Sequence, residues 1–147
     1  MCNMVFVSTD SPEDLAAIVS PNFEFSLLSE VEDLKLTCVL EHPNRWFVTG
    51  RYGGCSCHLR HLIDDPRVDF GFHEPFDWCP EDPEDVEDTA AIYDVFRRLV
   101  TNGANVDVVD LWNSEVAEPV ETVTVSLAEI DRGKFLFMEN RRLVLTV

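Results

Sequence analysis

The sequence predicts a single α+β domain, residues 1–147, with a mixed or largely antiparallel sheet and one principal helix. The chain has 147 residues, a usual length for one domain and enough to bury a core. Its composition is 46% hydrophobic and includes ten Phe, which excludes a chain that is disordered throughout. Short β-rich runs recur along the chain, whereas only one long segment has helical periodicity, and this mixture is typical of an α+β fold.

The first predicted elements are short. Residues 3–9 form a β-rich run. The segment from Ser11 to Asp14 then provides a cap, a proline at the first helical position and acids in the first turn, so we expect a short helix near 12–19. Further strands are expected at 23–28, 34–40 and 45–49. Cys38, inside the second of these strands, is expected to be a buried small hydrophobe.

A glycine-rich turn from Gly50 to Cys57 interrupts this series of strands. The residues after the turn have apolar side chains on one helical face and predict a short helix near 57–64, with Ser56 as a candidate N-cap. A strand over 68–72 and an acidic, proline-rich loop around 79–83 are expected to follow.

The principal helix is predicted over about 83–102. Asp82 is placed to cap it, Pro83 occupies its first position, and acidic residues fill its first turn. An apolar stripe follows at the spacing of a helix, and Gly103 is the expected residue just beyond the C-terminus.

The remainder of the chain is predicted to be β structure. Strands are expected at 106–112 and 120–127, and a closing hairpin is expected from 135–138 and 143–147. Asp107 and Asp110, both in the first of these strands, are expected to face solvent. The hairpin would complete the sheet.

The charge balance limits the kinds of partner. Eleven basic and 28 acidic residues give a formal net charge of −17, which repels nucleic-acid backbones and anionic membranes. We therefore expect no nucleic-acid or membrane partner, whereas a protein partner with a basic surface is compatible. No apolar run reaches the length of a spanning helix, and no basic flank marks a signal peptide, so a cytoplasmic protein is expected.

The cysteines are the main candidates for chemistry. There are five, and an odd number without a secretion signal argues against a disulfide framework. Cys2, Cys55, Cys57 and Cys79 lie near the chain start or in loops, where four thiolates suit a tetrahedral zinc ion, and an iron–sulfur cluster would use the same ligands. This predicts a metal-binding structural or interaction module. The substitute ligands are His58, His61 and His73.

The alternative is a small cysteine-dependent enzyme. Residues 42–63 contain no carboxylate, so a thiol there would have cationic neighbours that favour its ionised form. On a helix that starts near Cys57, His61 would share the face of that thiol and act as its base. Arg60 or Arg51 would orient an anionic substrate.

Three other interpretations of the cysteines remain open. Cys55 and Cys57 would form a strained and therefore oxidising disulfide pair. Cys2, after removal of Met1, would be an N-terminal nucleophile; this start resembles glutamine amidotransferases of the N-terminal-nucleophile type, although Asn3 replaces their glycine. Unligated cysteines that only pack in a turn are the third.

One resemblance extends over two segments, residues 2–9 and 46–57. The Met1-Cys2 start, a strand that ends in Ser-Thr, and a Gly-Cys-x-Cys turn after an aromatic strand together resemble a group of small uncharacterised bacterial proteins. The resemblance implies a bacterial type of protein and no particular activity. It also implies that Cys2, Cys55 and Cys57 form one spatial unit.

Overall fold

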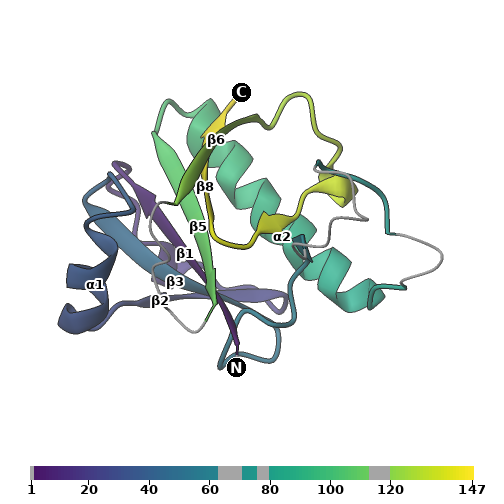
Figure 1. Ribbon diagram of the computed structural model, residues 1–147, viewed down its shortest axis with the longest axis horizontal. Helices are drawn as coiled ribbons and strands as arrows, with labels where there is room; N and C mark the ends of the chain where they lie inside the picture. The colour runs from purple at the N-terminus through teal and green to yellow at the C-terminus, as the bar shows by residue number, and fades with distance from the viewer. Residues whose placement is uncertain (1, 63–70, 76–79, 113–119) are drawn as a thin grey trace.

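The chain folds into a mixed sheet with a helix on each side (Figure 1). The computed structural model describes residues 2–62, 71–75, 80–112 and 120–147. Its elements are β1 (Asn3–Thr9), the 3-10 helix η1 (Leu15–Ala17), β2 (Phe23–Leu27), α1 (Glu30–Leu36), β3 (Asn44–Gly50), β4 (His61–Leu62), α2 (Pro83–Thr101), β5 (Val106–Trp112), β6 (Glu121–Ser126), the 3-10 helix η2 (Arg132–Lys134), β7 (Phe137–Met138) and β8 (Arg141–Thr146). The predicted α+β class is confirmed.

The main sheet has six strands in the order β2-β3-β1-β5-β8-β6. Neighbouring strands are antiparallel except for β6 and β8, which are parallel. The short strands β4 and β7 form a separate parallel pair. β7 therefore pairs with β4, so the expected hairpin between 135–138 and 143–147 is wrong.

Both faces of the sheet are covered, because successive residues of a strand point to opposite faces. Val5 and Val7 of β1 belong to the larger core, which α2 closes with residues such as Phe96. Phe6, between them, belongs to a smaller core that α1 closes through Leu36. Figure 1 shows the two helices on opposite sides of the sheet.

The principal helix matches its prediction closely. The Asp82 side chain accepts a hydrogen bond from the Glu84 N–H (2.9 Å), and Pro83 occupies the first turn. Gly103 follows the helix with φ of 90° and donates its N–H to the Val100 carbonyl (2.9 Å), the usual left-handed ending. Among the residues that the structure describes, neither this helix nor any other has the length and apolar character to cross a bilayer.

The predicted strand over 34–40 is wrong, because α1 occupies its first half. Ser29 and Glu32 form a reciprocal capping box, which satisfies the N–H groups at the start of the helix. Leu36 then points into the smaller core, whereas Leu34 is 70% exposed. Cys38 lies in the turn after α1 and is exposed, so its expected burial is also wrong.

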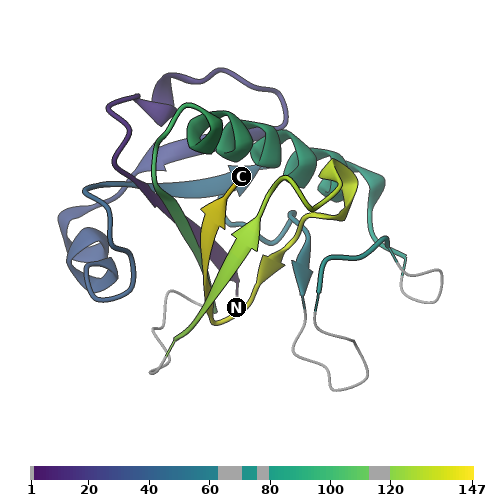
Figure 2. The same cartoon turned by 90° about the horizontal axis from the view of Figure 1, so that it is seen from above.

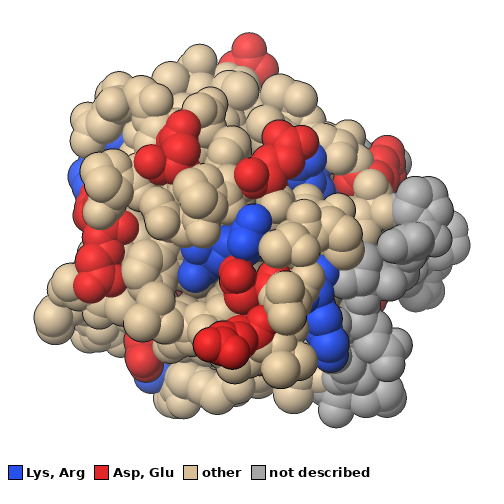
Figure 3. All heavy atoms as spheres, turned by 90° about the vertical axis from the view of Figure 1, so that its left-hand side faces the viewer, with Lys and Arg blue, Asp and Glu red and all other residues tan. Residues whose placement is uncertain are grey.

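The surface around α1 has mixed charge. Figure 3 shows this side of the molecule, on which basic side chains lie beside acidic ones and much of the area is uncharged. Arg45 and Asp33 form one such ion pair, at 3.0 Å.

The two short helices predicted earlier are also corrected. The helix near 12–19 is reduced to the 3-10 turn η1, capped by Asp14. The helix near 57–64 is absent from its described part: the chain turns at 57–58 and then enters β4. Pairing with β7 takes precedence there, since the Phe137 N–H bonds the Arg60 carbonyl (2.8 Å). In the expected strand over 68–72, residues 68–70 lie outside the described part, and Gly71 and Phe72 are not in a strand.

Candidate metal centre

Three cysteines meet where β1 begins and β3 ends. Cys2 directly precedes β1, whereas Cys55 and Cys57 lie in the turn after β3. Because β1 and β3 run antiparallel with Val5 opposite Val48, the residues before β1 lie beside the residues after β3. The three Sγ atoms all lie within 4.8 Å of one another.

The buried side chain and backbone of Ser56 fix the turn against β1. Its hydroxyl accepts a hydrogen bond from the Val5 N–H (2.8 Å) and donates one to the Val48 carbonyl (2.6 Å). Its N–H donates to the Asn3 carbonyl (3.0 Å), and its own carbonyl contacts the His61 ring (2.7 Å). Ser56 is therefore an anchor rather than the predicted N-cap, and it holds the cysteines on either side of it in place.

Two glycines let the chain turn back toward β1 just before the cysteines. Gly53 and Gly54 have φ of 63° and 78°, the left-handed region that other residues rarely adopt. The Gly53 N–H bonds the Gly50 carbonyl (3.0 Å), and the Cys55 N–H bonds the Gly53 carbonyl (2.9 Å). This tight loop presents Cys55 and Cys57 toward Cys2.

The buried His61–Asp110 ion pair contacts the turn through the backbone of Ser56. The His61 Nδ1 lies 2.6 Å from the Asp110 carboxylate, and its Nε2 lies 2.7 Å from the Ser56 carbonyl. Both neighbours are hydrogen-bond acceptors, so the ring that satisfies them carries a proton on each nitrogen. The Asn3 amide also approaches Asp110, at 3.3 and 3.4 Å.

This environment changes the pKa of His61. Burial lowers the pKa, but the hydrogen bond and negative charge of Asp110 outweigh burial and raise the pKa above its ordinary value. The positive charge of His61 in turn contributes to stabilising an ionised thiol at Cys55.

The pKa values of the Cys55 and Cys57 thiols are shifted in opposite directions. Burial raises the pKa of Cys55, but hydrogen bonds from Cys57 and Cys2, together with the charge of His61, outweigh burial and lower it. Burial and proton donation to Cys55 raise the pKa of Cys57 to about 12. Cys55 is therefore the first of this pair to ionise.

The fourth predicted ligand and the substitute histidines are not part of the described cluster. Cys79 lies outside the described residues. His58 lies 3.7 Å from Asp85, and the His73 Nδ1 contacts the Glu74 carbonyl (2.8 Å). The described cluster therefore contains three of the four predicted thiol ligands and none of the histidines.

The residues of the alternative enzyme are brought together only in part. His61 lies in a strand, and Asp110 and Ser56 engage both of its ring nitrogens, so it cannot act as a base toward Cys57 in this arrangement. The Arg60 side chain is only 1% exposed and binds Glu81 at 2.7 Å.

The arginines of that alternative instead join parts of the fold. Arg60 also donates to the backbone carbonyls of His73 (2.9 Å) and Gly133 (3.0 Å). Arg51 binds the buried carboxylate of Asp88 at 2.7 Å. Both guanidinium groups are thus engaged in structural contacts.

The sequence alone did not reveal the buried residues that surround the cysteine cluster and hold it in place. Asp107 and Asp110 are 0% and 1% exposed, so their expected position in solvent is wrong. The sequence contained a signal for this burial. Asp107 and Asp110 are three residues apart in an apolar strand, so their side chains point to opposite faces of the sheet, and here both faces are covered. Ser56 and Asn3 gave no comparable signal, because their partners are distant in sequence.

Comparison of the chain with protein-family models, curated proteins and solved structures finds no match. The fold and the cluster therefore define the class: an α+β domain whose cysteines lie close enough together to hold a metal ion.

Proposed function

We propose that the protein is a metal-binding module in which Cys2, Cys55 and Cys57 are thiolate ligands of a zinc ion. The observation that carries the proposal is the convergence of their three Sγ atoms within 4.8 Å from two segments distant in sequence. Zinc favours tetrahedral sites with sulfur ligands, usually from loops or the ends of elements.

The size of the cluster fits this ion. Zn–S bonds of about 2.3 Å at tetrahedral angles place sulfur atoms about 3.8 Å apart. The observed Sγ separations, all within 4.8 Å, are compatible with that spacing. Three thiolates leave one coordination position, for which Cys79, a water molecule or a group from a partner are the candidates. An iron–sulfur cluster is the less favoured occupant, because it usually needs four thiolates.

The metal would join the start of β1 to the turn after β3. Ser56 already holds these segments together through hydrogen bonds to Asn3, Val5 and Val48. We therefore expect the protein to fold without metal and to bind zinc at a largely preformed site, in contrast to small zinc domains that are unfolded without it.

A thiol-dependent activity is the second candidate, and the lowered pKa of Cys55 favours it. A thiolate with cationic and hydrogen-bonding neighbours is the reactive form of cysteine. In this candidate the nucleophile is Cys55 rather than Cys57, whose pKa is raised to about 12.

Elemental analysis of untagged protein purified anaerobically, combined with a thiol titration, tests both candidates. The metal proposal expects about one zinc per chain, with protection of the clustered thiols until a chelator is added. Cys55→Ser should lose the metal, whereas Cys38→Ser, which changes an exposed thiol outside the cluster, should keep it. Absence of metal after zinc reconstitution, with one thiol that reacts rapidly below pH 8, would contradict the metal proposal and favour the enzyme.

A further inference from the structure

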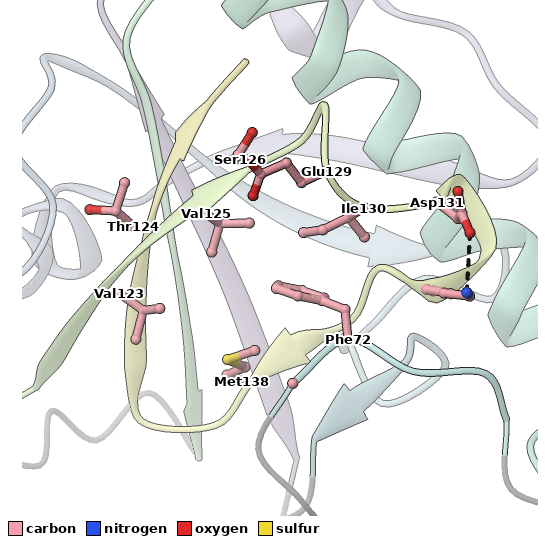
Figure 4. A pocket seen from close by; sticks show the side chains of 11 residues that line it. Phe72, Val123, Thr124, Val125, Ser126, Glu129, Ile130, Asp131 and Met138 are labelled. Atoms are coloured by element: carbon pink, nitrogen blue, oxygen red, sulfur yellow. Dashed lines mark ion pairs between the residues drawn. The ribbon is translucent and has the colours of Figure 1, made fainter.

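A groove lies beside β6, and it shares no residue with the cysteine cluster. Its volume is about 480 Å³, within the range of ligand-binding pockets. Figure 4 shows apolar side chains around it from β6, β7 and two loops: Val123, Val125, Met138, Phe72 and Ile130. The groove therefore combines apolar side chains with polar ones, and β6 borders it.

β6 is an outer strand of the main sheet. The Leu127 N–H donates a hydrogen bond to the Thr146 carbonyl (2.8 Å), and the Val125 carbonyl accepts one from the Thr146 hydroxyl (3.3 Å). The backbone N–H and C=O groups of these alternate residues therefore point toward β8. The N–H and C=O groups of Thr122 and Thr124 then point away from the sheet. Within the described ranges, no strand pairs with them on that side.

The groove extends to this edge of the sheet. Thr124 lines the groove together with Val123 and Val125, although its side chain points to the opposite face of the strand. An extended chain placed along the edge would thus lie beside both backbone hydrogen-bonding groups and the apolar side chains of the groove.

The rim of the groove is acidic. Glu129 and Asp131 line it, and so does Lys134. The Lys134 ammonium lies between two carboxylates, at 3.1 Å from Asp131 and 3.6 Å from Glu74. Its charge is therefore compensated, and the rim stays net negative on a chain of formal charge −17.

We propose that the β6 edge and its groove bind an extended segment of a partner protein by strand addition. Main-chain hydrogen bonds to Thr122 and Thr124 supply affinity, as in other complexes formed by strand addition. Apolar side chains at alternate positions of the segment enter the groove, because alternate residues of a strand share one face. Basic residues at the ends of the segment meet Glu129 and Asp131, and this complementarity selects the partner.

A synthetic peptide, acetyl-Lys-Thr-Val-Thr-Leu-Thr-Lys-amide, is the probe. Binding is measured by NMR on labelled protein, with and without zinc, since the groove and the cysteine cluster are separate. We expect saturable shifts at the amides of Thr122 and Thr124. Two peptides are controls: one with Glu in place of both Lys, and one with adjacent apolar residues, acetyl-Lys-Thr-Thr-Val-Leu-Thr-Lys-amide. Each should bind about ten-fold more weakly or worse.

Two variants locate the site. Thr124→Pro removes an N–H that points away from β8, so the sheet should remain intact while peptide binding is lost. Glu129→Lys should weaken binding of the Lys peptide by about ten-fold and improve binding of the Glu peptide. Glu24→Lys, on the opposite edge strand β2, should change neither. Thermal unfolding checks that each variant folds.

The proposal is overturned if the Lys peptide fails to bind the folded wild-type protein at about 1 mM. It is also overturned if Glu129→Lys leaves the preference between the two peptides unchanged. Neither result depends on whether the cysteines hold zinc, so failure here is distinguishable from failure of the metal proposal.

Discussion

Two aspartates of β5 are both buried, yet they face opposite sides of the sheet and have different partners. Asp107 contacts the Ser8 hydroxyl and the Arg142 guanidinium (2.7 Å) on the face that carries α1. Asp110, three residues later, contacts His61 (2.6 Å) and Asn3 next to the cysteine cluster. The same residue type in one strand thus takes part in two different ion pairs.

The difference lies in whether the cation can lose its proton. Arg142 stays charged at any accessible pH, so it always provides a positive charge for its ion pair with Asp107. His61 can release its proton when the pH rises above its raised pKa, so the Asp110 pair can change its charge. The adjustable pair lies beside the thiols, where metal binding itself displaces protons.

Asp107→Asn should have the largest effect on stability. It leaves the Arg142 side chain, only 12% exposed, without its buried counter-ion, although Glu41 remains 2.9 Å from it. Removal of one member of a buried pair commonly costs about 3–5 kcal/mol. We expect a loss of about 3 kcal/mol or more in urea unfolding, with zinc binding unchanged. A loss below about 1 kcal/mol would show that Glu41 alone neutralises Arg142.

Asp110→Asn should lower the free energy of unfolding by less than Asp107→Asn does, by about 1–2 kcal/mol at pH 7. The reason is that His61 can become neutral instead of remaining a buried charge without a partner. The thiols would then lose a nearby positive charge, so zinc affinity should fall by about ten-fold, as for other residues that support metal ligands. Competition with a chelator measures the affinity, and urea unfolding of the metal-free protein measures the stability.

The comparison between the two pairs provides the control for this experiment. Asp107→Asn changes the same residue type in the same strand, but its side chain points away from the cysteines. If both variants weaken zinc binding equally, general destabilisation explains the loss, and the assigned support by Asp110 is wrong.

The sequence predicts elements that have local signals. Asp82, Pro83 and Gly103 mark both ends of α2, and the structure follows them. The S-x-x-E pattern of Ser29 and Glu32 was an equally local signal for α1. The alternating leucines after it favoured a strand instead, and the helix is only seven residues long.

The candidate site is predictable only in part, because some of its contacts join segments that are distant in sequence. Cysteine positions and the resemblance in two segments grouped Cys2 with Cys55 and Cys57, and the structure brings these three together. The His61–Asp110 pair depends on the parallel pairing of β4 with β7. No spacing within the sequence encodes a contact between such distant segments.

The pH dependence of stability is the smallest expected effect and the sharpest test of the two pairs. Asp110 raises the pKa of His61 above its ordinary value of 6.5. In the metal-free protein, the stabilisation from this pair should be complete below the pKa of the unfolded chain and should disappear as pH rises through the folded pKa. NMR titration of the His61 ring measures that pKa directly.

The two aspartate variants should differ in this dependence. Asp107→Asn should retain it, whereas Asp110→Asn should abolish it and lower the pKa of His61, because burial then acts without the counter-ion. A His61 pKa that stays raised in Asp110→Asn would mean that another group, such as Glu139, supplies the negative charge.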